Sequence, residues 1–214
     1  MCGHVGLAGR ITWKEEKMFK DLLKLDVIRG SHATGVTALR RNFQEQVMET
    51  VTVKKAVDAF RYLNDKASDE VFKGMNYMLL GHNRHATRGA IVDENSHPFE
   101  FPNLVGAHNG SLTSFSKMYN AKDYEVDSQA LYSELNENGV DSMWSKANGA
   151  ASLVWFDKRE LKLNMLRNSQ RPMYYTTINK GKTLVWASEP WMIYVAAARN
   201  DIELDEDKTK QTVV

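Results

Sequence analysis

The sequence predicts an α+β fold with stacked layers. Short apolar segments bounded by glycine or polar turns recur along the chain, which is typical of β-strands. Only a few segments between them carry apolar residues at helical spacing. Strands that gather in groups, with few helices among them, favour α+β architecture over alternating α/β architecture. A chain of 214 residues suits one sizeable domain, or at most two small ones.

The first half of the chain predicts strands around one clear helix. The expected elements are a strand over 4–11, a helix over 14–29, two strands over 35–41 and 46–55 joined by a polar turn, and an amphipathic helix over about 57–73. In the first helix, Met18, Leu22, Leu25 and Ile28 recur at helical spacing. A buried apolar run then leads into a polar, glycine-closed loop within 77–89.

The second half predicts a strand, a helix and then a run of strands. Residues 103–112 form a strand that ends in a turn made by Asn109-Gly110, and 127–139 form a helix that stops at Asn138-Gly139. Four apolar segments over 149–157, 161–168, 172–179 and 183–189 are expected to form an antiparallel sheet. A short helix over 190–199 and a polar tail close the chain.

Composition excludes several classes of function. The formal net charge is +1, so no global field favours nucleic acid or a membrane surface. A single cysteine excludes an internal disulfide framework and fits a reducing compartment. The chain opens without a basic and apolar leader, and its longest apolar runs are far shorter than a membrane span. We therefore expect a soluble cytoplasmic domain that binds neither nucleic acid nor membrane.

The candidate chemistry lies in polar loops. They are Cys2 at the start of the chain, "GHNRHATRG" at 81–89, "NSHPF" at 95–99, "AHNGS" at 107–111 and "VDSQA" at 126–130. Two of them follow apolar strands, and rigid elements of that kind can hold side chains at a common edge. If Met1 is trimmed, the only thiol of the chain becomes its first residue.

An N-terminal thiol that cleaves an amide needs a base, oxyanion donors and groups that hold the substrate. The free α-amine of Cys2 can act as the base, as in enzymes with an N-terminal threonine. The Asn109 amide and the Gly110 backbone N–H can stabilise the oxyanion. Arg84 can bind the carboxylate of an amino-acid substrate through its guanidinium fork, and Asp127 can bind the ammonium.

These motifs resemble the class-II glutamine amidotransferases, which are N-terminal-nucleophile hydrolases. Met-Cys-Gly-x-Val-Gly, "RGSHATG", "HNRHATRG", "NSHPF", "HNGSL" and "VDSQA" occur in the order and rough spacing of that family. The likeness is strongest to the glutaminase domain of the glucosamine-6-phosphate synthase type. It extends through "GAASLVWFD" and "LVWASEP", and so defines one domain over 2–198 followed by a polar tail over 199–214.

The resemblance assigns a role to each motif residue. Cys2 matches the nucleophile, Asn109 and Gly110 the oxyanion hole, and Asp127 the acid that binds the α-ammonium. The glutamine-binding loop contributes Arg84, which matches the carboxylate-binding arginine, with Thr87 beside it. Two further matches are Arg29, the arginine near the nucleophile, and His97, the histidine of the pocket wall.

The resemblance also implies a fold and an activity. The fold is the four-layer αββα sandwich of N-terminal-nucleophile hydrolases. The activity is hydrolysis of L-glutamine to glutamate and ammonia through a Cys2 thioester, with no cofactor and no metal. Family members normally pass the ammonia to an acceptor domain, so a separate synthase subunit is the expected partner. The sequence does not choose the acceptor, and a homo-oligomer is compatible with it.

The chain departs from the family pattern at four positions. His32 replaces the usual aspartate of the "RG-x-D" motif, and His85 replaces a tryptophan after the substrate arginine. Arg88 stands where histidine is common, and His4 where an aliphatic residue is common. The departures concern closure of the glutamine loop and onward transfer of ammonia rather than the catalytic groups themselves.

Each of these residues also has a purely structural interpretation. Cys2 could be a small buried strand residue, Asp127 a helix N-cap and Asn109-Gly110 an ordinary turn. Likewise, Arg84 could be a surface cation and His97-Pro98 a plain loop. Other functional hypotheses are a stand-alone glutaminase or amidohydrolase, a catalytically silent regulatory homologue, and a metal hydrolase. The metal hydrolase would use the histidine-rich set His82, His85, His97 and His108.

Overall fold

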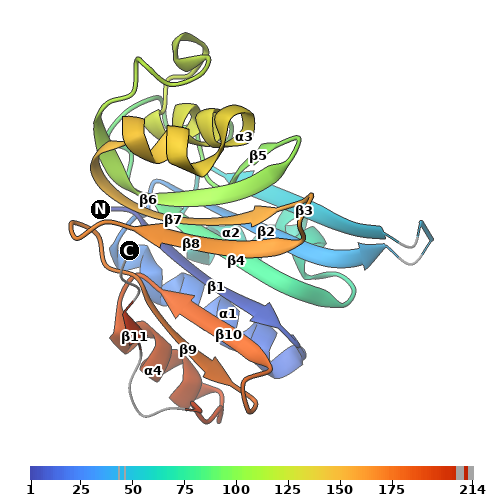
Figure 1. Ribbon diagram of the computed structural model, residues 1–214. Helices are drawn as coiled ribbons and strands as arrows, with labels where there is room; N and C mark the ends of the chain where they lie inside the picture. The colour runs from blue at the N-terminus through green and yellow to red at the C-terminus, as the bar shows by residue number, and fades with distance from the viewer. Residues whose placement is uncertain (43, 46, 206–209, 212–214) are drawn as a thin grey trace.

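Two antiparallel sheets pack face to face, and helices cover the outer face of each (Figure 1). The computed structural model describes every residue except 43, 46, 206–209 and 212–214. The strands are β1 (Gly3–Gly9), β2 (Ala33–Asn42), β3 (Val47–Lys55), β4 (Asn76–Arg84), β5 (Phe99–Phe101), β6 (Leu104–Ser114), β7 (Asn148–Asp157), β8 (Lys162–Arg167), β9 (Tyr174–Ile178), β10 (Thr183–Ala187) and β11 (Lys210–Gln211). The helices are α1 (Trp13–Leu25), α2 (Ala59–Asn64), α3 (Asp127–Lys146) and α4 (Pro190–Arg199), with 3₁₀ turns η1 (Asp26–Ile28), η2 (Lys66–Phe72) and η3 (Ala121–Asp123).

The larger sheet has the strand order β11-β9-β10-β1-β4-β2-β3, and α1, α2 and α4 cover its outer face. Helix α1 begins at a capping box, in which the Thr12 side chain and the Glu15 carboxylate satisfy each other's backbone N–H groups. Its apolar face buries Met18, Phe19 and Leu22 completely. This core fixes β1 in the middle of the sheet, between β10 and β4.

The smaller sheet has the order β5-β6-β7-β8, and α3 lies on its outer face. Helix α3 contains Gly139 with φ 80° and ψ 178°, so two helical segments meet there at a kink. The expected stop at Asn138-Gly139 is therefore present, but a second segment continues to Lys146. A third apolar core fills the space between the two sheets, with the fully buried Trp186 at its centre.

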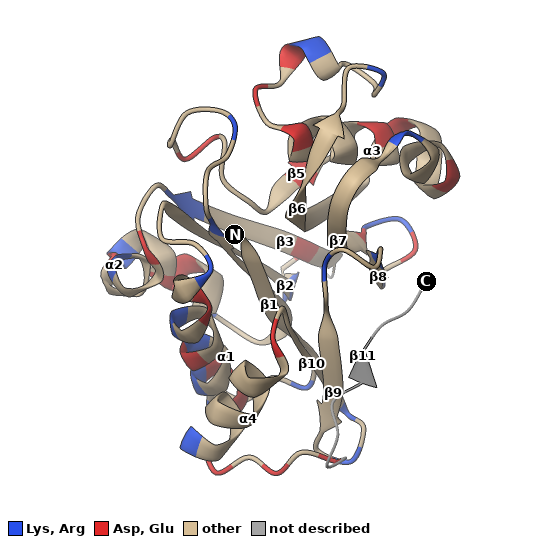
Figure 2. Cartoon of the chain, turned by 90° about the vertical axis from the view of Figure 1, so that its left-hand side faces the viewer, with Lys and Arg blue, Asp and Glu red and all other residues tan. Residues whose placement is uncertain are grey.

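The predicted α+β fold and its four layers are confirmed: helices, sheet, sheet, helix. Most expected strands and the first and last helices lie where the sequence placed them. The strand expected over 46–55 is β3, although residue 46 lies outside the described part of the chain. None of the described helices combines the length and the apolar character that a membrane crossing requires. Acidic and basic residues are intermixed on the helices (Figure 2).

Two predictions about strands were wrong. Asn109-Gly110 makes no turn, because β6 runs straight through it and pairs Asn109 with Ser152 and Gly110 with Ala151. The four C-terminal segments do not share one sheet: β7 and β8 belong to the smaller sheet, and β9 and β10 to the larger one. Local patterns could not separate them, since each segment is an apolar strand with a polar turn after it.

Two further elements differ from expectation. The helix expected over 57–73 is broken at Asp65, whose backbone is extended (φ −86°, ψ 126°) and whose side chain caps η2. The tail expected over 199–214 is not wholly separate from the domain. Leu204 forms an isolated bridge with Ile178, and β11 adds to the edge of the larger sheet beside β9.

Candidate active site

Cys2 directly precedes the central strand β1, at the end of the sheets where the N-terminus lies (Figure 2). The His85 backbone holds its thiol from both sides. The His85 N–H donates to Cys2 Sγ at 3.3 Å, and the thiol donates to the His85 carbonyl at 3.4 Å. On the other side of the residue, Arg29 Nε donates to the Cys2 carbonyl at 3.1 Å and Arg29 forms an ion pair with Glu189. These hydrogen bonds hold Cys2 and its thiol in a fixed position directly before strand β1.

Opposing effects act on the Cys2 thiol. Burial raises its pKa above the usual range. The His85 N–H, the positive amino terminus and Arg84 act in the other direction, because each of them stabilises the thiolate. The His85 N–H is thus one of the groups that favour the thiolate, although the effect of burial is larger.

Arg84 is the last residue of β4 and is 2% exposed. Its guanidinium donates to backbone carbonyls of its own loop, at 2.5 Å to Arg88 and 2.8 Å to Ala90. Burial lowers the pKa of Arg84, and these loop carbonyls accept hydrogen bonds from its guanidinium. Thr87 lies within the same loop.

Asp127 is the first residue of α3 but not its N-cap, which is Val126. The carboxylate instead reaches back to β6 and accepts from the Leu112 N–H at 2.7 Å and from the Ser128 N–H at 3.0 Å. Asp127 is 5% exposed, so its charge is held close to the strand that carries Asn109 and Gly110. The N-cap interpretation of Asp127 is wrong.

Asn109 is fully buried within β6 and faces the space between the sheets. Its Nδ2 donates to Ser188 Oγ at 3.3 Å, and its Oδ1 has no hydrogen-bond partner. Ser188 Oγ also accepts from the His4 N–H at 3.0 Å. Ser188 therefore ties the Asn109 amide to β1, two residues beyond Cys2.

One small hollow collects most of the site residues that the sequence predicts. Cys2, Arg84, Thr87, His97, Gly110 and Asp127 all line it, together with His85, Arg88, His108, Val126 and Ser128. We call it the Cys2 hollow. Asn109 and Arg29 are not in its lining; Asn109 sits beside Gly110 in β6, and Arg29 contacts the Cys2 carbonyl.

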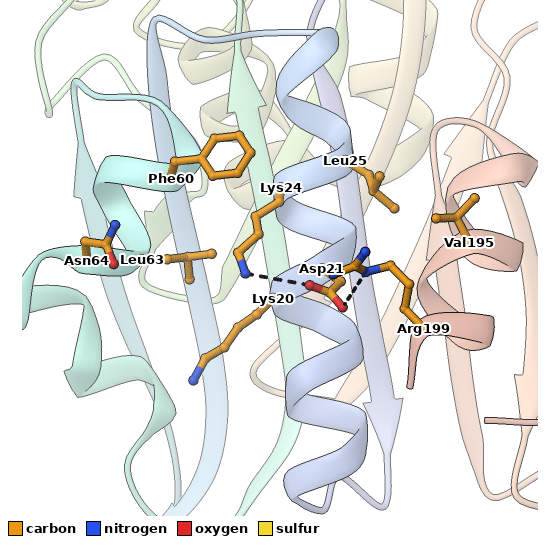
Figure 3. A pocket seen from close by; sticks show the side chains of 9 residues that line it. All are labelled: Lys20, Asp21, Lys24, Leu25, Phe60, Leu63, Asn64, Val195 and Arg199. Atoms are coloured by element: carbon orange, nitrogen blue, oxygen red, sulfur yellow. Dashed lines mark hydrogen bonds and ion pairs between the residues drawn. The ribbon is translucent and has the colours of Figure 1, made fainter. Parts of the chain in front are cut away.

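The Cys2 hollow measures about 10 Å³, which is about the space of one water molecule. Larger hollows lie elsewhere on the molecule. One of about 610 Å³ lies between α1, α2 and α4 (Figure 3), where Asp21 pairs with Lys24 and Arg199. It opens among the helices of the outer layer and contains none of the predicted catalytic residues, so size alone does not identify the active site here.

Four buried histidines lie in or beside the site: His97 and His108 line the Cys2 hollow, and His4 and His82 lie next to them. The His82 and His97 rings lie 3.9 Å apart, and His4 Nε2 lies 2.9 Å from Ser152 Oγ. Burial lowers the pKa of all four, that of His4 to about 3, so these imidazoles are neutral near pH 7.

The metal hypothesis needs His82 and His85 to converge, and they do not. His82 is buried between the sheets, whereas His85 is exposed outside them. Among the residues that the structure describes, no group of three or more histidine, cysteine or acidic side chains is arranged to hold a metal ion.

Comparison with known proteins identifies the family of the chain. The model of the glutamine amidotransferase domain family matches residues 82–194, which is more than half of the chain. The chain belongs to this family. It is a class-II glutamine amidotransferase domain, so the resemblance inferred from the sequence motifs is confirmed.

The curated relatives of this amidotransferase domain are larger proteins. It is 23% identical to a glutamine–fructose-6-phosphate aminotransferase of Bartonella henselae over 81% of this chain and 29% of that protein. It is 28% identical to the protein of the same name from Sulfolobus acidocaldarius over 55% of this chain and 19% of that protein. The chain thus spans less than a third of the length of these relatives.

Solved structures show the same fold at low identity. A glutamine phosphoribosylpyrophosphate amidotransferase from B. subtilis superposes with a TM-score of 0.65 at 17% identity, over 99% of this chain and 49% of that one. An allosteric regulatory enzyme of purine biosynthesis gives 0.71 at 18% identity, over 99% and 48%. A glutamine aminotransferase class-II domain protein from Silicibacter pomeroyi gives 0.55 at 15% identity, over 99% and 91%.

Three residues of this amidotransferase domain escaped the sequence analysis. Ser188 contacts Asn109 and Glu189 contacts Arg29; the motif "LVWASEP" contains both residues but assigns no role to either. Asp26 is fully buried; Asn83 Nδ2 donates to its Oδ2 at 3.1 Å, and a Cβ on Gly3 would collide with its carboxyl group. The available signal for Asp26 was an acid within the mostly apolar stretch "LLKLDVI".

Proposed function

We propose that this domain hydrolyses the side-chain amide of L-glutamine, with Cys2 as the nucleophile. The observation that carries the proposal is the Cys2 hollow itself. A thiol held by a backbone N–H shares it with a buried arginine, a buried aspartate and a strand glycine. A thiol, a cation and an anion in one hollow suit an amino-acid substrate whose side chain reacts while its carboxylate and ammonium are held.

The proposed reaction has two halves. The thiol proton passes to the α-amine of Cys2, and the thiolate attacks the amide carbon of glutamine. Asn109 and the Gly110 N–H stabilise the oxyanion, the C–N bond breaks, and the α-ammonium returns the proton to the departing ammonia. Water then adds to the thioester, the C–S bond breaks, and glutamate and the free thiol are released. The α-amine is available only once Met1 has been removed.

Glutamine can enter only if the loop after β4 moves. The Cys2 hollow holds about 10 Å³, and loop carbonyls occupy the Arg84 guanidinium. We propose that Arg84 exchanges these carbonyls for the substrate carboxylate while Thr87 follows in the same loop. Arg29 and His97 act from the edge of the site, Arg29 by holding the Cys2 carbonyl and His97 as part of the wall.

We further propose that the ammonia passes to an acceptor site on a separate synthase subunit. Support for an acceptor site comes from the relatives, which are much longer proteins named as aminotransferases. A stand-alone glutaminase and a catalytically silent homologue are the alternatives that the experiment separates.

The experiment measures intact mass and glutamate release for the wild type and for Cys2→Ala. We expect a wild-type mass that lacks Met1 and turnover that falls at least about a thousandfold in Cys2→Ala, because no other thiol can replace the nucleophile. Equal turnover in the two proteins would refute a Cys2 mechanism.

A trimmed and folded wild type without turnover would call for a second measurement, in which candidate synthase subunits are added. Turnover that appears only with a subunit supports the separate acceptor. Turnover that is full without one supports the stand-alone glutaminase, and none under either condition identifies a silent homologue.

A further inference from the structure

Two of the positions that depart from the family pattern are in contact with each other. His32 lies in the loop before β2 and His85 directly follows β4, 53 positions later. Their rings stack with centroids 4.6 Å apart and planes inclined by 23°. This contact lies outside the sheets, next to the Cys2 hollow, which His85 lines.

His32 also holds the backbone on both sides of His85. Its own N–H donates to the Arg84 carbonyl at 3.0 Å, and its Nδ1 accepts from the Ala86 N–H at 3.0 Å. The peptide groups of His85, fixed between these two hydrogen bonds, are the groups that hold the Cys2 thiol. A continuous path of hydrogen bonds therefore runs from the His32 imidazole through residues 84–86 to Cys2 Sγ.

One of these hydrogen bonds depends on the charge of His32. The backbone N–H of Ala86 can only donate, so His32 Nδ1 must carry a lone pair. A protonated imidazole carries N–H groups on both nitrogens, and its Nδ1–H would face the Ala86 N–H. Protonation thus replaces a hydrogen bond with a contact between two donors.

The contact between His32 and His85 lies among several other titratable and charged groups. The titratable and charged groups around the contact are His85, the amino terminus and thiol of the chain start, Arg84 at the end of β4, and Asp26 and Arg29 in and after η1. The positive amino terminus is the largest cause that lowers the pKa of His85, and His32 acts in the same direction. The buried Asp26 carboxyl faces Gly3 and Asn83, and Glu189 is paired with Arg29.

We propose that His32 is a proton-sensitive positioning residue, which fixes the His85 peptide against the Cys2 thiol only while its imidazole is neutral. His32 does not touch the substrate; it acts through Ala86 and His85. Loss of the hydrogen bond from Ala86 loosens the His85 peptide groups that contact Cys2 Sγ, including the N–H that favours the thiolate, so the orientation and the ionisation of Cys2 change together. The effect of His32 on catalysis rests on the proposed glutaminase function, but the effect of His32 on the Cys2 thiol does not.

The test uses alkylation by iodoacetamide, because Cys2 is the only cysteine of the chain and intact mass reports its modification directly. Rates are measured without glutamine from pH 5.5 to 9 in the full chain. If Cys2 were the only titrating group, its alkylation rate would fall tenfold per pH unit below the pKa of the thiol. We call this reference the single-ionisation line. Imidazoles titrate between about pH 5 and 8. We therefore expect the wild-type rate to fall more steeply in that range, to about fivefold below the single-ionisation line, which corresponds to one hydrogen bond.

Three variants locate the effect. His32→Asn keeps an acceptor but does not titrate, so its rate should follow the single-ionisation line. His32→Ala loses the acceptor, so it should react about fivefold more slowly than His32→Asn at neutral pH. His85→Asn keeps the backbone clamp, so it should retain the steep acid limb. Circular dichroism and thermal unfolding establish that each variant is folded.

A second readout is independent of reactivity. In ¹⁵N-labelled protein, the Ala86 amide resonance should titrate in the wild type and remain constant in His32→Asn. A wild type that follows a single ionisation, or a steep limb that survives in His32→Asn, would overturn the inference. If alkylation behaves as expected but glutamine is not hydrolysed, the proposed function fails while the role of His32 stands.

Discussion

The space between the two sheets is apolar at one end and polar at the end that holds Cys2. Strands β4, β6 and β7 line both ends. From the apolar end toward Cys2, each of them presents two apolar side chains and then one polar side chain to the space between the sheets. They are Met78, Leu80 and His82 on β4; Val105, Ala107 and Asn109 on β6; and Phe156, Val154 and Ser152 on β7. The period of two that builds the core thus also positions the site.

The two ends contribute differently to the free energy of folding. The apolar end stabilises the fold by removing carbon surface from water. The polar end buries groups that must find hydrogen bonds, and some atoms there do not, including His82 Nδ1 and Asn109 Oδ1. The first end therefore controls stability, and the second end should control activity and the response to pH.

The largest expected effect on stability comes from Trp186 at the apolar end. Its ring is fully buried and packs on Gly6, where an added Cβ would lie only 1.9 Å from a ring carbon. Trp186→Ala leaves a large cavity, and we expect a loss of about 3–5 kcal/mol in the free energy of unfolding. Urea denaturation measures it.

The Trp186→Phe variant is the matched control, since it retains most of the apolar volume. It should lose markedly less stability than Trp186→Ala. Glutamate release per folded molecule should be unchanged in both. Equal losses in the two variants, or a specific loss of activity in folded Trp186→Phe, would contradict the division between the two ends.

An intermediate effect is expected from pH at the polar end. Burial lowers the pKa of His4 to about 3, far below the value of about 6.5 for an unfolded histidine. Between these values the unfolded chain binds the extra proton, so stability falls as the pH falls. One such group costs about 1.4 kcal/mol per pH unit, or about 2 kcal/mol between pH 6.5 and 5.

The comparison of the wild type with His4→Val isolates this contribution. We expect the free energy of unfolding, measured by urea denaturation, to fall between pH 6.5 and pH 5 by about 2 kcal/mol less in His4→Val than in the wild type. His82, His97 and His108 remain in both proteins, so neither curve becomes flat. Curves that run parallel would show that His4 does not titrate on unfolding.

Asp26 acts in the opposite sense. Burial raises its carboxyl pKa to about 8, so the native state keeps a proton that the unfolded chain releases above about pH 4. Its contribution to stability is therefore lost as the pH rises from about 4 to 8, while that of His4 is lost as the pH falls. Together, these two buried groups should favour an intermediate pH.

The sequence predicted what local pattern and residue chemistry determine. The strands follow from apolar runs, and α1 follows from the spacing of Met18, Leu22 and Leu25. The turn prediction at Asn109-Gly110 was wrong because a dipeptide that favours turns can also lie within a strand. Here the long neighbouring strand β7 pairs with both residues. Here tertiary pairing overrides turn preference.

The finer details of the site depend on contacts that no local pattern encodes. His32 and His85 are 53 positions apart, and Ser188 and Asn109 are 79 apart. The sequence named the residues of the Cys2 hollow through motifs. It could not show that Arg84 is occupied by its own loop, because those hydrogen bonds depend on how the loop folds back after β4.

The smallest expected effect is also the most specific one. Ser188→Ala removes the hydroxyl that accepts from the Asn109 amide and the His4 N–H. We expect a loss of about 1 kcal/mol in stability. We also expect a roughly tenfold fall in kcat with an unchanged KM, because Asn109 is then free to rotate away from the developing oxyanion.

The Ser152→Ala variant is the matched control at the same end of the core. It removes the partner of His4 Nε2 but leaves the contact between Asn109 and Ser188. It should lose similar stability and keep kcat. Alkylation of Cys2 by iodoacetamide forms no oxyanion, so it should proceed at the wild-type rate in both variants. A fall of kcat in Ser152→Ala as large as in Ser188→Ala would mean that general loosening of the polar end, rather than the position of Asn109, limits catalysis.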